Sequence, residues 1–193
     1  MSPGAPIDDG VFRLMFVCTA NRCRSPMAQA LATELLAQRG VDAEVVSCGI
    51  MEGGSAASPG AVRAMARRGL DLSRHLSHQM DSHTVEAATL IVTMERRHLA
   101  SVAELSMPAV ERAFTLPELG DLATVVGPRR PEVSVPSWIA QANAMRLPAS
   151  VLTMSSDSDI DDPLGGPNRA YRRTAEQLEE LLELSLGSLF PTP

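Results

Sequence analysis

Short apolar segments alternate along this chain with segments of helical periodicity. The apolar segments have the length and composition of buried strands, and they span residues 11–17, 44–48, 89–93 and 112–116. The segments with helical spacing or helix-start signals follow them, at residues 26–39, 59–68, 82–88, 95–105 and 167–186. Because strand–helix–strand units join parallel strands by right-handed crossovers, this alternation predicts an α/β fold with a doubly wound parallel sheet.

The length of the chain indicates a single domain. Its 193 residues suit one core with little room for a second, so we expect one domain over residues 11–190 after a disordered lead-in at residues 1–10. No apolar run approaches the roughly 18–20 residues that span a bilayer, and the acidic start lacks the regions of a signal peptide. Three cysteines cannot all pair, which argues against a secreted disulfide framework. We therefore expect a cytoplasmic protein with no membrane partner.

The charged residues exclude several classes of function. All 17 basic residues are arginine, which excludes nucleotide loops, Schiff bases and kinase sites that depend on lysine. Genomic base composition is a sufficient cause of this usage. The net charge of −6 and the 3% of aromatic residues argue against nucleic acid as a partner, since there is neither a basic excess nor a set of stacking rings.

The stretch from Pro117 to Asp161 does not follow the alternation. It holds five prolines and only a weak helical pattern at residues 136–145. Loops of this length are uncommon inside compact domains, where they are usually lids, binding loops or disordered segments. We therefore expect a long insertion, at about residues 117–158, before the loop that precedes the final helix.

A polar turn that contains a cysteine follows the first strand. It runs from Cys18 to Ser25, and Ser25 with Pro26 forms a helix-start signal in which Ser25 is the N-cap. A turn in this place directs backbone N–H groups and the positive end of a helix at one point, which suits an anion and favours the thiolate of Cys18. Arg24 offers a planar fork for two phosphate oxygens, and the Ser25 hydroxyl can donate to the thiolate.

A second polar turn precedes the final helix. It contains Asp161, Asp162 and Pro163, followed within three residues by two glycines. An aspartate on a loop that leans over the anion site suits the general acid that nucleophilic cleavage of a phosphoester needs. Asp162 is the first choice for this acid, and the adjacent Asp161 is the alternative.

The segment Phe16-Val-Cys-Thr-Ala-Asn-Arg-Cys-Arg-Ser-Pro-Met-Ala28 resembles the signature of the low-molecular-weight protein tyrosine phosphatase family. Further matches are found at Ser47-Cys48-Gly49, Arg74-His75 with Gln79, Thr93-Met94-Glu95 with His98, and Asp162-Pro163 with Gly165-Gly166. The resemblance covers about residues 11–116 and 159–186. It implies a four-stranded sheet of flavodoxin-like order 2-1-3-4 in a three-layer α/β fold.

The resemblance also implies a mechanism and the residues that perform it. Cys18 attacks phosphorus and forms a cysteinyl-phosphate, Arg24 binds the phosphoryl oxygens, and Asp162 protonates the leaving oxygen and later activates water. The substrate-binding residues implied are those of the turn: Thr19, Ala20, Asn21, Arg22, Cys23 and Ser25. Asn21 would hold the turn in shape and Ser25 would stabilise the thiolate. The implied substrate is a phosphorylated protein or a small phosphoester, and neither a metal nor an organic cofactor is required.

Several positions depart from the pattern of the family. Ala20 stands where glycine is usual, and Arg22 replaces a commonly apolar residue and adds positive charge at the rim. Leu164 stands where an aromatic residue is usual, and residues 49–58 contain no aromatic residue, which leaves the preference for phosphotyrosine open. Trp138, within the expected insertion, is a candidate for the missing wall.

Two other functions remain as alternatives. Arsenate reductases resemble this fold and turn, but their thiol-coupled forms use further cysteines downstream, and none follows Cys48 in this chain. A phospho-binding regulator without turnover is the second alternative, and the intact Cys18 and Arg24 argue against it. Cys23 either forms a reversible disulfide with Cys18 or packs the turn. His75 and His98 are interpreted as structural hydrogen-bonding residues, and the oligomeric state is left open.

Overall fold

Four parallel strands form the sheet, in the order β2-β1-β3-β4. The computed structural model describes residues 10–146 and 159–192. Its strands are β1 (Phe12–Cys18), β2 (Ala43–Gly49), β3 (Leu90–Thr93) and β4 (Ala113–Thr115). The four predicted strands and the predicted order 2-1-3-4 are therefore confirmed.

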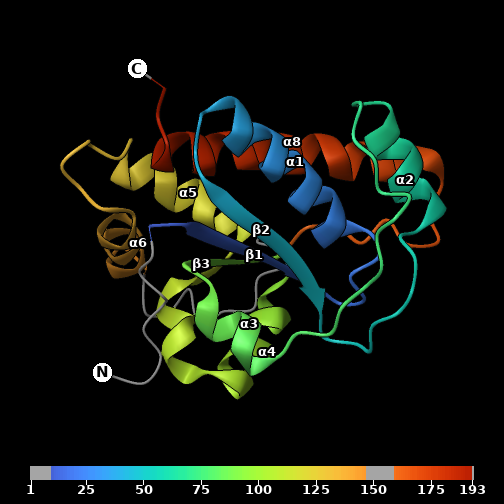
Figure 1. Cartoon of the computed structure of the whole chain (residues 1–193), viewed down its shortest axis with the longest axis horizontal. Coiled ribbons are helices and arrows are strands. Elements are labelled where there is room, and N and C mark those ends of the chain that lie inside the picture. Colours follow the sequence, from blue (N-terminus) through green and yellow to red (C-terminus); the bar gives the residue numbers. More distant parts are fainter. Residues whose placement is uncertain (1–9, 147–158, 193) are drawn as a thin grey trace.

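The side chains of β1 point alternately to the two faces of the sheet. Leu14 and Phe16 belong to one buried cluster, and Met15 and Val17 belong to another. The first cluster is covered by α1 (Arg24–Gln38), α2 (Pro59–Ala66), α5 (Leu116–Val126) and α8 (Asn168–Leu189). The second is covered by α3 (Ser82–Ala87), α4 (Arg96–Leu105) and the 3-10 helix η1 (Met107–Arg112). Figure 1 shows the two helical layers on opposite sides of the sheet, which confirms the three-layer fold.

Serine–proline pairs begin two of the predicted helical segments, Ser25–Pro26 before residues 26–39 and Ser58–Pro59 before residues 59–68, and only the second serine is an N-cap. Ser58 is the N-cap of α2 and accepts a hydrogen bond from the N–H of Ala61. The prediction of Ser25 as the N-cap of α1 is wrong, because α1 begins at Arg24 and Cys23 is its N-cap. Ser25 lies inside the helix, and its hydroxyl forms hydrogen bonds with residues of the preceding loop.

The chain after β4 is helical rather than irregular. Thr115 and Glu118 form a capping box at the start of α5, in which each side chain accepts a hydrogen bond from the backbone N–H of the other residue. Pro117 lies in the first turn of α5, where its missing N–H removes no helical hydrogen bond. The predicted insertion is therefore wrong at its start, because α5 packs against α8 and the sheet as a regular part of one layer.

The second half of the expected insertion is described only in part. The weak helical pattern at residues 136–145 is confirmed as α6 (Val135–Ala144), which Ser134 caps through a hydrogen bond from the N–H of Ser137. Residues 147–158, to which the rest of the predicted insertion belongs, lie outside the described part of the chain.

The final helix is amphipathic, as predicted. Its buried side includes Tyr171, Ala175, Leu178 and Leu182, and its exposed side includes Glu176, Glu179, Glu180 and Glu183. Among the helices that the structure describes, none is long and apolar enough to cross a membrane.

Trp138 lies in α6 and is almost completely buried. Its side chain is 2% exposed, and its indole N–H donates to the carbonyl oxygen of Gly127 at 3.0 Å. Gly127 ends α5, which starts at the carboxyl end of β4 and returns toward the amino ends of the strands. The Cys18 turn follows the carboxyl end of β1, at the opposite edge of the sheet. The hypothesis that Trp138 forms a substrate wall is therefore wrong.

We expect Trp138→Ala to lower the free energy of unfolding by about 3–5 kcal/mol, because it removes a large buried ring and leaves a cavity. Trp138→Phe should cost less, since it keeps most of the apolar contact and loses the hydrogen bond to Gly127. Urea unfolding followed by circular dichroism measures both variants. Unchanged stability of Trp138→Ala would contradict the buried position.

Candidate active site

The segment from Cys18 to Ser25, called the anion loop below, joins the carboxyl end of β1 to α1. β1 lies between β2 and β3, and the chain reaches these two neighbours over opposite faces of the sheet. In parallel sheets this reversal opens a crevice at the carboxyl ends of the central strands, where ligands bind. The anion loop lies at that crevice.

The backbone of the anion loop presents hydrogen-bond donors. Within the described residues, no acceptor takes the N–H groups of residues 19–23. Asn21 adopts a φ of 51°, a left-handed conformation that asparagine tolerates better than most residues. Ala20 lies outside that region, so its Cβ introduces no such strain. Amide donors without protein acceptors, next to a helix N-terminus, form a site for an anion.

Asn21 is held from several sides. Its Nδ2 donates to the Oγ atoms of Ser25 at 2.9 Å and Ser47 at 2.8 Å, and its Oδ1 accepts from the N–H of His78 at 2.9 Å. The carbonyl oxygen of Asn21 lies 2.7 Å from Nε2 of His75, a ring whose pKa is lowered by burial. The predicted structural role of His75 is confirmed, and these contacts fix the left-handed turn.

Gly49, at the end of β2, approaches the anion loop closely. A Cβ atom at this position would lie 2.9 Å from the backbone nitrogen of Asn21 and from the carbonyl oxygen of Thr19. That oxygen also accepts a hydrogen bond from the N–H of Ile50 at 2.9 Å. The contact requires glycine, because any side chain at residue 49 would displace the backbone of the loop.

Cys18 lies at the base of the anion loop and is 3% exposed. Its Sγ is 3.0 Å from Oγ of Ser25, as predicted, and that hydroxyl also lies 3.3 Å from the carbonyl oxygen of Cys48. The three cysteines are not joined to one another. Burial raises the pKa of Cys48 to about 11 and also raises the pKa of Cys23, whose Sγ is 3.0 Å from Oγ of Ser58.

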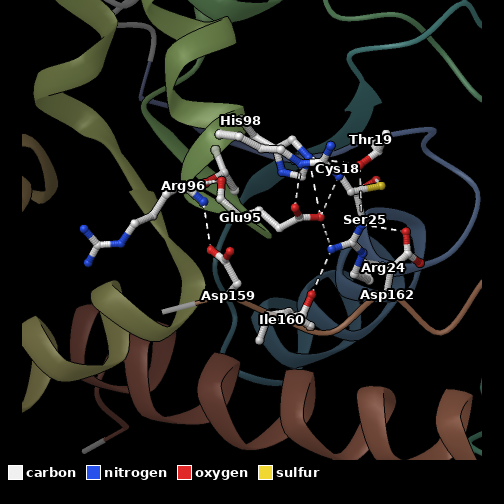
Figure 2. Close-up of polar contacts among 12 residues, drawn as sticks. Cys18, Thr19, Arg24, Ser25, Glu95, Arg96, His98, Asp159, Ile160 and Asp162 are labelled. Atoms are coloured by element: carbon white, nitrogen blue, oxygen red, sulfur yellow. Dashed lines mark hydrogen bonds and ion pairs between the residues drawn. The ribbon is translucent and has the colours of Figure 1, made fainter. Parts of the chain in front are cut away.

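Arg24 is 1% exposed and lies beside Cys18. One terminal nitrogen, Nη1, is 2.5 Å from Oε1 of Glu95 and 2.8 Å from the carbonyl oxygen of Ile160. The other, Nη2, is 2.7 Å from Oδ2 of Asp162. Figure 2 shows the guanidinium between these three partners. Its Nε is buried and has no partner within the described residues.

Glu95 was given no role in the analysis of the sequence, although it follows β3 directly and so had to lie at the same edge of the sheet. Burial alone would raise its pKa, but hydrogen bonds from Arg97 and Arg24, together with the charge of Arg24, outweigh this effect and lower it. The carboxylate bridges the two arginines, since Arg97 Nε lies 2.6 Å from Oε2. Glu95 therefore holds Arg24 from the side opposite Asp162.

Thr19 links the anion loop to α4. Its Oγ1 accepts a hydrogen bond from Arg97 at 2.8 Å and lies 3.1 Å from Nε2 of His98. His98 is fully buried, and this burial lowers its pKa to about 4, with the nearby Arg24 and Arg97 adding to the effect and Glu95 opposing it. The hydrogen bond between Nε2 of His98 and Oγ1 of Thr19 confirms the predicted structural role of this histidine.

The loop that carries Asp162 is anchored to the end of β3. The N–H of Ile160 donates to the carbonyl oxygen of Met94 at 2.8 Å, and Oδ1 of Asp159 accepts from the N–H of Arg96 at 2.9 Å. Both aspartates are exposed, but Asp162 pairs with Arg24, whereas Asp161 has no hydrogen bond within the described residues. The structure thus brings Cys18, Arg24 and Asp162 together and leaves Asp161 outside.

Exposed apolar side chains flank the anion loop where aromatic walls are missing. The N–H of Met51 donates to the carbonyl oxygen of Thr19 at 3.1 Å, and the side chain of Met51 is exposed. Leu164, whose N–H donates to Oδ1 of Asp162 at 3.1 Å, is also exposed. Arg22, half-buried at the rim, donates through Nε to the carbonyl oxygen of Ala56 at 3.0 Å.

Metal-ligating side chains do not gather at this site. Across residues 10–146 and 159–192, no group of three histidine, cysteine, aspartate or glutamate residues is arranged to hold a metal ion.

Comparisons with known proteins agree with this geometry. A protein-arginine-phosphatase of Geobacillus stearothermophilus is 30% identical over 173 residues, which cover 89% of this chain and 92% of that protein. An arsenate reductase of Staphylococcus aureus is 36% identical over 97 residues, which cover 50% of this chain and 66% of the reductase. The solution structure of a low molecular weight protein tyrosine phosphatase from Bacillus subtilis has a TM-score of 0.69 at 27% identity, over 92% of this chain and 97% of that one.

The family comparison covers the sheet and the anion loop together. The sequence model of the low molecular weight phosphotyrosine protein phosphatases matches residues 13–122. That range includes β1 from its second residue, the other three strands, the anion loop and Glu95. This chain is therefore a member of the low molecular weight phosphotyrosine protein phosphatase family.

Proposed function

We propose that this chain is a cytoplasmic phosphatase that removes the phosphoryl group from tyrosine residues of proteins, with residues 11–190 as its phosphatase domain. In this proposal Cys18 is the nucleophile, Arg24 binds the phosphoryl oxygens and Asp162 is the general acid. One observation carries it: the guanidinium of Arg24 lies beside Cys18, at a loop whose N–H groups at residues 19–23 have no acceptor within the described residues. A tetrahedral dianion fits such a set of donors.

The first chemical step transfers the phosphoryl group to sulfur. The thiolate of Cys18, to which the Ser25 hydroxyl donates, attacks phosphorus in line with the bond to the tyrosine oxygen. The amides of the anion loop and Arg24 stabilise the charge on the three equatorial oxygens. Asp162 gives its proton to the departing phenolate, so the products are a free tyrosine and a phosphocysteine at Cys18.

The second step releases phosphate. Asp162, now a carboxylate, takes a proton from a water molecule, and the resulting hydroxide attacks phosphorus. The S–P bond breaks and returns the electron pair to Cys18 as thiolate. Orthophosphate leaves, and Asp162 is again protonated for the next substrate.

Binding of a phosphate by the terminal nitrogens of Arg24 would displace an existing contact. In this structure the carboxylate of Asp162 accepts a hydrogen bond from Nη2 of Arg24 at 2.7 Å. A phosphate that binds Arg24 breaks the ion pair between Arg24 and Asp162. The carboxyl group of Asp162 is then available to contact the leaving oxygen. Asp161 lacks this relation to Arg24, so we assign the general acid to Asp162.

Phosphoarginine is the second candidate substrate, because a relative that covers most of the chain is a protein-arginine-phosphatase. The rim of the loop favours tyrosine instead. Arg22 adds a positive charge there, which would repel the guanidinium of phosphoarginine, whereas the exposed Met51 and Leu164 offer apolar contact to a phenyl ring. These two features support phosphotyrosine as the first choice.

We expect Cys18→Ser to abolish hydrolysis of p-nitrophenyl phosphate, with a loss of more than about 1,000-fold in kcat. Asp162→Asn should lower kcat by about 100-fold or more for phosphotyrosine and much less for p-nitrophenyl phosphate, because nitrophenolate leaves without a proton. Asp161→Asn is the matched control and should retain activity. Steady-state kinetics on both substrates measure these effects, and an equal loss in the two aspartate variants would contradict the assignment of the acid.

The substrate class is tested by comparing kcat/KM for one peptide sequence that carries either phosphotyrosine or phosphoarginine. We expect phosphotyrosine to be preferred, and Arg22→Thr to reduce the preference because it removes the repulsive charge. If the wild type prefers the phosphoarginine peptide, phosphoarginine rather than phosphotyrosine is the substrate. Arsenate-dependent oxidation of added thiols without peptide hydrolysis would instead identify a reductase, and binding without turnover would identify a regulator.

The buried His98 predicts a loss of stability in mild acid. The unfolded chain takes up a proton on this ring near pH 6.5 and the folded chain only near pH 4, so the unfolded state binds more protons between these values. Stability therefore falls as the pH falls through this window, by about 1.4 kcal/mol per pH unit at most. His98→Gln keeps an acceptor for Thr19 but does not titrate. Urea unfolding from pH 4.5 to 7.5 should show a flatter curve for the variant, and parallel curves would contradict the burial of a neutral ring.

A further inference from the structure

A cavity of about 560 Å³ lies beside the loop that carries the proposed general acid. One wall contains Asp161, Asp162 and Pro163, and the other is a face of α8 that includes Arg169 and Arg173. Asp162 thus belongs to the cavity and, through its contact with Arg24, to the proposed site. If the leaving oxygen of a bound substrate protein lies at Asp162, the polypeptide next to the phosphorylated residue passes along this cavity.

The two arginines of the cavity wall have no opposite charge in contact with them. Arg169 and Arg173 are exposed, and neither forms a hydrogen bond or an ion pair within the described residues. Further along the same helix, by contrast, Glu179 pairs with Arg68 at 3.1 Å. Residues four apart on a helix lie on one side of it, so Arg169 and Arg173 present two positive groups to the same space.

The place of these arginines along α8 is electrostatically unfavourable. Arg169, Arg172 and Arg173 all lie in the first two turns, and the first turn contains no acidic residue. A helix N-terminus carries a partial positive charge and is stabilised by acidic side chains rather than basic ones. An arrangement that opposes local stability is expected where function requires it.

We propose that Arg169 and Arg173 bind an acidic side chain of the substrate protein that lies within about three residues of the phosphorylated residue. This inference rests on the proposed function, because it names a feature of the substrate of that same site. An extended peptide advances roughly 3.3–3.6 Å per residue, so a glutamate one to three positions away reaches from Asp162 into the cavity. A guanidinium pairs with a carboxylate through two parallel hydrogen bonds, and the cavity admits the side chain between the acid loop and α8.

The test compares phosphotyrosine peptides that carry three glutamates, or three glutamines, on the amino or the carboxyl side of the phosphotyrosine. For wild-type protein we expect kcat/KM about three- to tenfold higher with glutamate on one of the two sides, through KM rather than kcat. The preference should decrease in 0.5 M salt. R169Q/R173Q should lose it, and R172Q, on the same turn of α8 but outside the cavity wall, should keep it.

Charge reversal supplies a second variant. R169E/R173E should prefer peptides in which lysine replaces the glutamates, and all variants should hydrolyse p-nitrophenyl phosphate as the wild type does, because the arginines do not touch the reacting atoms. An unchanged glutamate preference in R169Q/R173Q, an equal loss in R172Q, or no preference in the wild type would overturn the subsite. Failure of the wild type to hydrolyse p-nitrophenyl phosphate would overturn the proposed function itself.

Discussion

A single buried guanidinium, that of Arg24, connects the three loops on which the site depends. It belongs to the start of α1, and it contacts Glu95 after β3 and both Ile160 and Asp162 before α8. A charge with 1% exposure is tolerated only when it is paired and hydrogen-bonded. The contacts that satisfy Arg24 therefore also fix the distance between the nucleophile and the proposed acid, so stability and geometry depend on the same group.

The curvature of the anion loop depends on contacts with β2 that do not involve Arg24. Gly49 allows the end of that strand to touch the loop backbone, and Asn21 completes a left-handed turn that hydrogen bonds hold from several sides. These contacts hold the backbone of the loop in place without a ligand, and its N–H groups at residues 19–23 have no acceptor within the described residues. Donors that are fixed before the substrate binds are the condition under which electrostatic stabilisation of a transition state is most effective.

Much of the fold and the core of the site could be predicted from the sequence, because both depend on local signals. Buried strands and amphipathic helices follow from periodicity, and Cys18 and Arg24 follow from a turn between a strand and a helix. The helix α5 was missed because the five prolines between residues 117 and 161 indicated an irregular segment, whereas Pro117 lies in a first turn, where a proline is compatible with a helix. The end of β3 placed Glu95 at the edge of the sheet that carries the site, but its pairing with Arg24 could not be predicted, because the two residues are far apart in the chain. The position of Trp138 could not be predicted for the same reason, since it depends on a contact with the end of α5.

The anchoring of the acid loop has a consequence for how such a protein can diversify. Asp159 and Ile160 are attached to the backbone at the end of β3 and the start of α4, immediately before Asp162. The position of Asp162 relative to β3 is therefore set by these two hydrogen bonds. Substitutions that keep both bonds leave Asp162 beside Arg24, so the sequence can vary around them without moving the proposed general acid.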